Sequence, residues 1–149
     1  RIGAVGASFG GYSVFQLAGN HEGRFKSFIS HCGLFDNRSM YGTTEELFFV
    51  NKDMGGAYWE KDNEIAQKTY NEFNPINYVS NWDTPILIIQ GAKDFRVPIE
   101  QGQQAFQAAQ LLGIKSKFIL FPEENHWVLQ PQNALVWQRE FFNWLEETL

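Results

Sequence analysis

The sequence predicts an α/β fold in which a mostly parallel sheet of about four strands is flanked by helices. Short apolar segments typical of buried strands alternate with longer segments whose apolar residues recur at helical spacing. Glycine after a helix and proline at the start of the next separate these segments. Such alternation favours right-handed crossovers between parallel strands, with helices covering both faces of the sheet.

The composition fits one globular domain of 149 residues, with 44% hydrophobic and 19% charged residues. The chain carries 12 basic and 17 acidic residues without a basic run, so nucleic acid is not expected as a partner. Apolar runs such as Ile86–Ile89 are far shorter than the roughly 20 residues of a membrane span, so no membrane association is expected. The single cysteine excludes an internal disulfide and leaves the localisation open.

The first segments predict a βαβ unit. Residues Ile2–Ala7 are small and apolar on both faces, as in a buried parallel strand, and they lead directly into a predicted helix. That helix is expected to end at about Ala18, before the stop signal of Gly19. A second strand is expected over Phe25–Cys32.

The middle of the chain predicts an excursion of two helices. Thr43 and Glu46 have the spacing of a capping box, and Asp62 precedes an apolar series at helical spacing. Pro85 then introduces the short β-branched run Ile86–Ile89, which predicts a fully buried third strand.

The last third predicts helix, strand and helix. Pro98 suits the first turn of a helix that ends at Gly113. A fourth strand is expected over Lys117–Phe121, and Pro131 can start a final amphipathic helix.

One motif lies between the first strand and the first helix. Residues Gly6–Gly11 match G-x-S-x-G in the strand-turn-helix setting that a nucleophilic serine needs. Glycine is expected at positions 6 and 10 because a Cβ at Gly6 or Gly10 would crowd the neighbouring strand or helix. The turn exposes the hydroxyl of Ser8, and the backbone N–H of Phe9 is the expected oxyanion donor.

Two later residues complete a candidate triad. Asp94 lies three residues past Gly91, after the third strand, and His126 lies five residues past Phe121, after the fourth. Parallel strands bring such positions to one edge of a sheet. The chain order Ser8, Asp94, His126 is that of the α/β-hydrolases, so we expect nucleophile, orienting acid and general base respectively.

Other carboxylates compete for the role of the acid. Asp83, Glu123 and Glu124 are the alternatives, and none of them follows the fully buried strand Ile86–Ile89 as Asp94 does.

The other histidines have simpler interpretations. His21 lies in a polar loop, where a solvated side chain is expected. His31 stands beside Cys32, but one thiol and one imidazole fall short of a four-ligand zinc site, so a packed histidine is favoured. No metal and no cofactor are expected.

These motifs resemble those of the prolyl-oligopeptidase-type serine peptidases, which include dipeptidyl peptidases and acylaminoacyl peptidases. The likeness covers nearly the whole chain. It is carried by Gly6-Ala-Ser-Phe-Gly-Gly-Tyr12, Phe73-Asn-Pro-Ile-Asn-Tyr78, Pro85–Gly91 with Asp94-Phe-Arg-Val-Pro98, and Glu124-Asn-His-Trp127. The double glycine and the Asp-x-x-Val-Pro context are the more specific parts.

The resemblance implies the C-terminal part of an α/β-hydrolase catalytic domain over residues 1–149, acting on peptides through an acyl-enzyme on Ser8. It also suggests an apolar substrate pocket, with Arg96 either at a substrate carbonyl or in solvent. Plain packing is an equal alternative for three of the pocket candidates, Phe35, Met40 and Tyr41. The pocket candidates are Phe9, Phe35, Met40, Tyr41 and Val97.

Members of this family carry an N-terminal β-propeller and further strands before the nucleophile strand. Because the chain opens on Arg1 without a signal-peptide pattern, we expect that it was trimmed from a longer protein. The strand Ile2–Ala7 would then expose an apolar edge, which predicts a homo-oligomer. A carboxylesterase of the same fold and a catalytically silent fragment that self-associates are the alternative functions.

Overall fold

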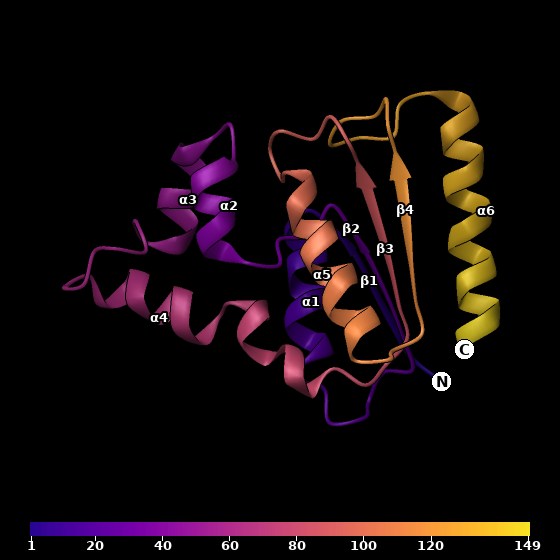
Figure 1. The fold of residues 1–149 in the computed structure, drawn as a ribbon, viewed down its shortest axis with the longest axis horizontal. Coiled ribbons are helices and arrows are strands. Elements are labelled where there is room, and N and C mark those ends of the chain that lie inside the picture. Colours follow the sequence, from indigo (N-terminus) through magenta and orange to yellow (C-terminus); the bar gives the residue numbers. More distant parts are fainter.

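Four parallel strands form one sheet in the order β1-β2-β3-β4 in the computed structural model, which describes residues 1–149 (Figure 1). Every neighbouring pair is parallel, as the alternating pattern predicts. The predicted α/β fold is therefore confirmed. The strands are β1 (Gly3–Ala7), β2 (Ser27–His31), β3 (Ile86–Gly91) and β4 (Ser116–Phe121).

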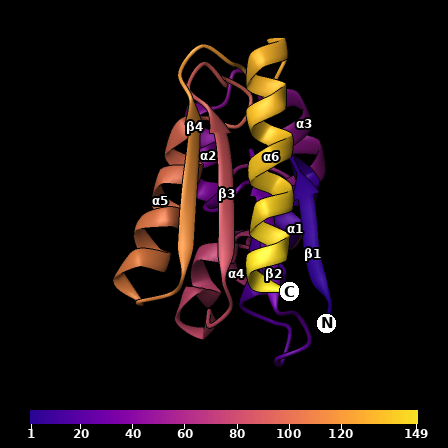
Figure 2. The same ribbon diagram turned by 90° about the vertical axis from the view of Figure 1, so that its right-hand side faces the viewer.

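Helices cover both faces of the sheet. Helices α1 (Phe9–Ala18) and α5 (Ile99–Leu111) pack on one face, and α6 (Pro131–Thr148) lies along the strands on the other, as Figure 2 shows. None of the helices combines the length and the apolar character that a membrane span requires.

The segment between β2 and β3 projects beside the sheet (Figure 1). The sequence predicts two helices in this segment, but the structure has three α-helices and one 3-10 helix. These are α2 (Asn37–Thr43), α3 (Leu47–Met54), α4 (Glu64–Glu72) and the 3-10 helix η1 (Pro75–Asn81).

The predicted capping box at Thr43 is wrong. Thr43 is the last residue of α2, and Glu46 precedes α3 without making a side-chain cap. The neighbouring Thr44 makes the turn instead: its hydroxyl accepts a hydrogen bond from the Glu46 N–H at 3.3 Å and donates one to the carbonyl of Arg96 at 2.7 Å. The turn between α2 and α3 is thus bonded to the loop after β3.

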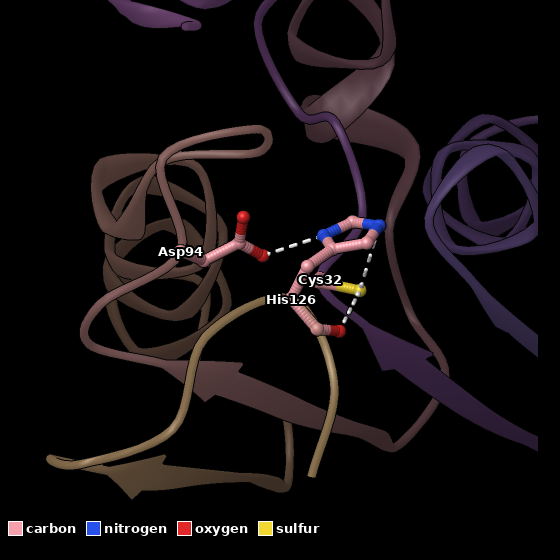
Figure 3. Close-up of side chains that lie close together, drawn as sticks. All are labelled: Cys32, Asp94 and His126. Carbon is pink, nitrogen blue, oxygen red and sulfur yellow. Dashed lines mark hydrogen bonds and ion pairs between the residues drawn. The ribbon is translucent and has the colours of Figure 1, made fainter. Parts of the chain in front are cut away.

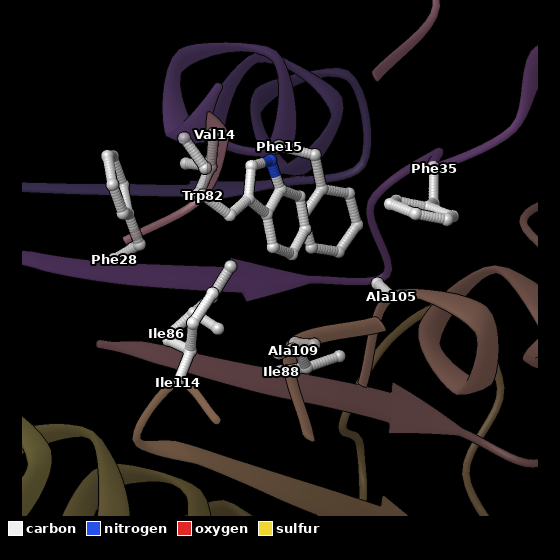
Figure 4. Close-up of a cluster of buried hydrophobic side chains, with 11 residues drawn as sticks. Val14, Phe15, Phe28, Phe35, Trp82, Ile86, Ile88, Ala105, Ala109 and Ile114 are labelled. Atoms are coloured by element: carbon white, nitrogen blue, oxygen red, sulfur yellow. The ribbon is translucent and has the colours of Figure 1, made fainter. Parts of the chain in front are cut away.

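Alternating side chains of the central strands fill a core on each face. Figure 4 shows the larger cluster, in which Ile86 and Ile88 of β3 pack with residues of α1 and α5. Leu87 and Ile89 point the other way, toward Trp144 of α6. Burial on both faces is why β3 is a continuous apolar run rather than an alternating one.

The glycines of the serine motif do not share one role. A Cβ on Gly6 would lie 2.2 Å from the carbonyl oxygen of Gly10, so the strand and helix touch through Gly6. A Cβ on Gly10 would meet nothing within 4 Å, which corrects the prediction that crowding requires glycine there. Gly11 is the second crowded position, because its Cβ would lie 2.7 Å from Cα of Gly33.

We expect Gly6→Ala to lower the free energy of unfolding by about 1–3 kcal/mol, because the new methyl overlaps backbone that cannot move independently. Gly10→Ala is the matched control and should leave stability unchanged or slightly higher, since alanine favours the helix. Urea denaturation of both variants measures the difference. Equal destabilisation by the two substitutions would contradict the contact at Gly6.

Candidate active site

Ser8 occupies a strained turn between β1 and α1. Its φ of 57° and ψ of −118° lie where side chains other than glycine are uncommon, at a cost of about 1–3 kcal/mol. The Ser8 N–H donates to the carbonyl of His31 at 2.9 Å, which ties the turn to the end of β2. The N–H of Phe9 opens α1 and therefore has no partner within the helix.

Asp94 is held in the loop after β3 with its side chain buried. Only 2% of the residue is exposed, and Oδ1 accepts hydrogen bonds from the N–H groups of Arg96 at 3.0 Å and Val97 at 2.9 Å. The amide of Gln90 lies 3.4 Å from Oδ2. These donors leave Oδ2 aimed at the loop that follows β4.

His126 bridges the acid and the serine. Its Nδ1 lies 2.7 Å from Oδ2 of Asp94, and its Nε2 lies 3.0 Å from Oγ of Ser8. Since a carboxylate only accepts hydrogen bonds, Nδ1 carries the proton and Nε2 is left to accept from the serine hydroxyl. The structure thus brings together the three side chains that the sequence predicts, in an arrangement able to take a proton from Ser8.

Cys32 is a neighbour of His126 that the sequence does not reveal, because 94 residues separate the two. Figure 3 shows the thiol beside the imidazole: Sγ lies 4.0 Å from Nε2 and 3.8 Å from the carbonyl oxygen of His126. Burial raises the pKa of Cys32 to about 12, so the group is a neutral thiol at ordinary pH. It therefore packs against the imidazole without adding a second negative charge.

The thiol, imidazole and carboxylate also form a set of three possible metal ligands. Donor atoms of Cys32, Asp94 and His126 all lie within 4.8 Å of one another. Asp94 and the Nδ1 atom of His126 are, however, already bonded to each other, and three donors are one fewer than a structural zinc site uses. The hydrogen-bonded interpretation accounts for these contacts without an ion.

The competing carboxylates have other partners. Asp83 lies 3.4 Å from the imidazole of His21, and Glu123 pairs with Lys93. Glu124 is bonded to the backbone of the His126 loop. None of the three contacts the imidazole of the candidate triad.

His21 is not solvated, contrary to the prediction. Its side chain is 3% exposed and packs edge-on against Phe28. The Nδ1 atom accepts from the Phe25 N–H at 3.2 Å, which leaves the proton on Nε2, facing Asp83 at 3.4 Å. The polar residues around His21 in the sequence hide the fact that its ring closes one end of the core.

His31 is a packed histidine, as predicted. Its Nδ1 lies 3.3 Å from the indole N–H of Trp137, which donates to it, while the buried Nε2 has no partner. Burial, and secondarily the nearby His126, lower the pKa of His31 to about 4. The ring is therefore neutral at physiological pH.

An apolar pocket of about 560 Å³ opens beside Ser8. Its wall combines the start of α1 with α3 and the loop after β3. Arg96 stands on this wall, with its guanidinium 2.8 Å from Glu46 and 3.4 Å from Glu45. The lining residues are Ser8, Phe9, Tyr12, Leu34, Glu46, Phe49, Asp53, Met54, Thr69, Phe73 and Arg96.

The structure corrects most of the predicted pocket residues. Phe35 lies in the core beneath α1, and Met40 and Val97 are buried in the cluster that joins the excursion to the sheet. Tyr41 turns toward Trp59 and donates its hydroxyl to Asn51 at 3.0 Å. Phe35, Met40 and Val97 are buried and Tyr41 packs on Trp59, so none of the four lines the pocket.

The pKa of His31 predicts a specific pH dependence of stability. A folded-state pKa near 4, against an ordinary value of 6.5, means that the unfolded chain binds a proton first as the pH falls. Above pH 6.5 His31 should therefore leave the free energy of unfolding independent of pH. Between pH 6.5 and pH 4 its effect should lower the free energy of unfolding by about 3 kcal/mol. Urea unfolding of wild type and His31→Gln across this range measures it, and equal pH slopes would contradict it.

Comparisons with known proteins show which family the chain is similar to. A model of the prolyl oligopeptidase family matches residues 1–149. The chain is 57% identical over 149 residues to dipeptidyl-peptidase 5 of Porphyromonas gingivalis, covering 100% of the chain and 22% of that protein. It is 54% identical over 148 residues to dipeptidyl-peptidase 5 of Porphyromonas endodontalis, covering 99% of the chain and 21% of that protein.

Solved structures show the same fold. An acylaminoacyl peptidase of Pyrococcus horikoshii superposes with a TM-score of 0.87 at 24% identity, over 100% of this chain and 24% of that one. Dipeptidyl peptidase 4 of Porphyromonas gingivalis superposes with a TM-score of 0.79 at 20% identity, over 100% of this chain and 20% of that one. The chain spans about a fifth of the length of the curated relatives it matches. On the match over its whole length, the chain belongs to the prolyl oligopeptidase family.

Proposed function

We propose that the protein containing this chain is a serine peptidase of the dipeptidyl or acylaminoacyl type that acts through an acyl-enzyme on Ser8. The observation that carries the proposal is the unbroken series of contacts from Asp94 to His126 at 2.7 Å and from His126 to Ser8 at 3.0 Å, beside an apolar pocket. The relatives named dipeptidyl-peptidase 5 support the peptidase assignment.

The geometry supports a two-step reaction. As Ser8 Oγ attacks the peptide carbonyl, its proton passes to Nε2 of His126, and Asp94 stabilises the imidazolium that forms. The N–H of Phe9 is proposed to donate to the oxyanion. The peptide C–N bond then breaks and the leaving amine takes the proton from Nε2. Water next attacks the acyl-enzyme as His126 takes its proton, the ester bond to Ser8 breaks, and the proton passes from Nε2 back to Ser8 Oγ.

The pocket beside Ser8 favours an apolar residue before the scissile bond. Aromatic and aliphatic side chains, among them Phe49 and Phe73, form most of its wall. We propose that Arg96, which glutamates hold on the same wall, donates to a substrate carbonyl.

An esterase with the same triad is the alternative function. The preference of the full-length protein for amide or ester substrates discriminates between a peptidase and an esterase.

The edge of the sheet supports a proposal about organisation. Strand β1 is the first of the four strands in the sheet; Val5 on it is 51% exposed, and Ile2 just before it is 54% exposed. We propose that residues 1–149 form the C-terminal part of the catalytic domain and that, in this chain taken by itself, the edge of β1 pairs with a second copy.

A fluorophosphonate probe tests the proposed nucleophile. In the full-length protein we expect labelling of Ser8 that is lost in Ser8→Ala and His126→Ala, with turnover of peptide amides reduced by about 10⁴-fold or more. Ser13→Ala is the matched control, because its hydroxyl lies one turn further along α1 and donates to the Phe9 carbonyl at 3.0 Å. A full-length wild type that is neither labelled nor active on peptides would disprove the proposal.

Substitution of a wall residue tests the pocket. We expect Phe49→Ala to lower kcat/KM for substrates with a bulky apolar residue before the scissile bond by about 10- to 200-fold, and to have little effect on small ones. Phe48→Ala is the matched control, because Phe48 is 77% exposed and does not line the pocket. Identical substrate profiles of the Phe48 and Phe49 variants would place the acyl site elsewhere.

A further inference from the structure

Glu124 is a buried carboxylate without a cation beside it. The residue is 3% exposed, and it takes part in no salt bridge. Three N–H donors surround it instead: Oε2 accepts from the backbone of Leu129 at 3.0 Å, and Oε1 accepts from the backbone of Gln130 at 2.9 Å and the amide of Asn133 at 2.8 Å. These bonds lower the pKa of the Glu124 carboxyl, so the group is an anion at physiological pH.

The donors lie on the far side of the segment that contains His126. Residue 124 precedes the histidine by two positions, whereas Leu129 and Gln130 follow it and lead into α6. The side chain of Glu124 thus spans the four residues 125–128 and joins the two ends of the loop. Inside this closure, the Asn125 side chain accepts from the Trp127 N–H at 2.9 Å.

Apolar packing contributes little to fixing this loop. Trp127 is 64% exposed and Leu129 is 68% exposed, so of the side chains that follow His126 mainly Val128 packs on the core. Polar contacts must therefore determine its conformation. Removal of a buried hydrogen-bonded anion leaves its donors unsatisfied, which costs more than the loss of an ordinary hydrogen bond.

The backbone of Glu124 also joins this loop to the loop of Asp94. Its carbonyl accepts from the Lys93 N–H at 2.9 Å. A Cβ on Gly91 would lie 2.6 Å from that same carbonyl and 2.2 Å from the carbonyl of Asn125, so the loop rests directly on the end of β3. One residue thus closes the His126 loop with its side chain and attaches it to the acid's loop with its backbone.

We propose that Glu124 is a positioning residue that holds His126 between Asp94 and Ser8. The inference rests on the proposed peptidase function and assigns Glu124 a role in the geometry of proton transfer rather than contact with substrate. None of the residues that the carboxylate contacts lines the pocket beside Ser8. The interaction should therefore affect the chemical step and leave substrate binding nearly unchanged.

The test is Glu124→Gln in the full-length enzyme. Glutamine keeps the shape, but its NH₂ group must face one of the three donors, so one end of the loop is displaced. We expect kcat for a peptide amide to fall on the order of 10- to 100-fold, since small displacements of catalytic groups have effects of this size. KM should stay within about twofold of wild type, because the pocket is intact.

Glu123→Gln is the matched control. It removes the same charge from the adjacent position, but the Glu123 side chain is 66% exposed and pairs only with Lys93. Its kcat should equal that of wild type. A Glu124→Gln enzyme that unfolds at the wild-type temperature and keeps wild-type kcat would overturn the inference, as would an equal loss of kcat in both variants.

A second substitution covers the case in which Glu124→Gln does not fold. Asn133→Ala retains the carboxylate and removes one donor, so we expect kcat to fall severalfold at unchanged KM. Unchanged kcat in Asn133→Ala, together with an unfolded Glu124→Gln, would overturn the inference. Glu124 would then contribute only to the stability of the fold. Failure of the proposed function is distinguishable, because the wild type itself would then neither hydrolyse peptide amides nor react with the fluorophosphonate.

Discussion

In-register parallel pairing of the four strands is the constraint on which the site depends. Ala7 pairs with His31, and His31 pairs with Ile89, so the carboxyl ends of β1, β2 and β3 lie at one level. The loops that follow these strands and β4 meet at that edge. A slip of one residue in any pair would turn every side chain of that strand to the opposite face, and it would separate the groups that now lie within hydrogen-bonding distance.

Backbone strain is concentrated at the same edge. Ser8 and Cys32 have φ values of 57° and 43°, and each is the first residue after its strand. Such conformations persist where the surrounding packing determines them, at a cost of about 1–3 kcal/mol each. Here the packing includes the close approach of Gly11 to Gly33 and the bond from the Ser8 N–H to His31. These two backbone conformations direct the hydroxyl of Ser8 and the thiol of Cys32 toward the imidazole of His126.

Two buried carboxylates take different parts in this arrangement. Asp94 and Glu124 both lie beneath the surface, and N–H donors rather than cations satisfy most of their acceptor sites. Asp94 keeps one oxygen for His126, whereas both oxygens of Glu124 bind the loop that carries it. The first contact orients the imidazole, and the second is proposed to fix the backbone beneath it. Fixed donors need no reorganisation as charge develops during reaction.

The sequence by itself determined the four parallel strands, their flanking helices and the three residues Ser8, Asp94 and His126. These follow from local patterns, namely buried apolar runs, turn glycines and chain order. Such patterns predict the same elements in any fold of this class. Only the tertiary structure decided that Cys32 packs against the His126 imidazole and that the Glu124 side chain joins the two ends of the His126 loop. It also decided that Phe49 rather than Phe35 lines the pocket. Such roles depend on contacts between residues far apart in the chain or on the direction of a turn, and neither leaves a local pattern.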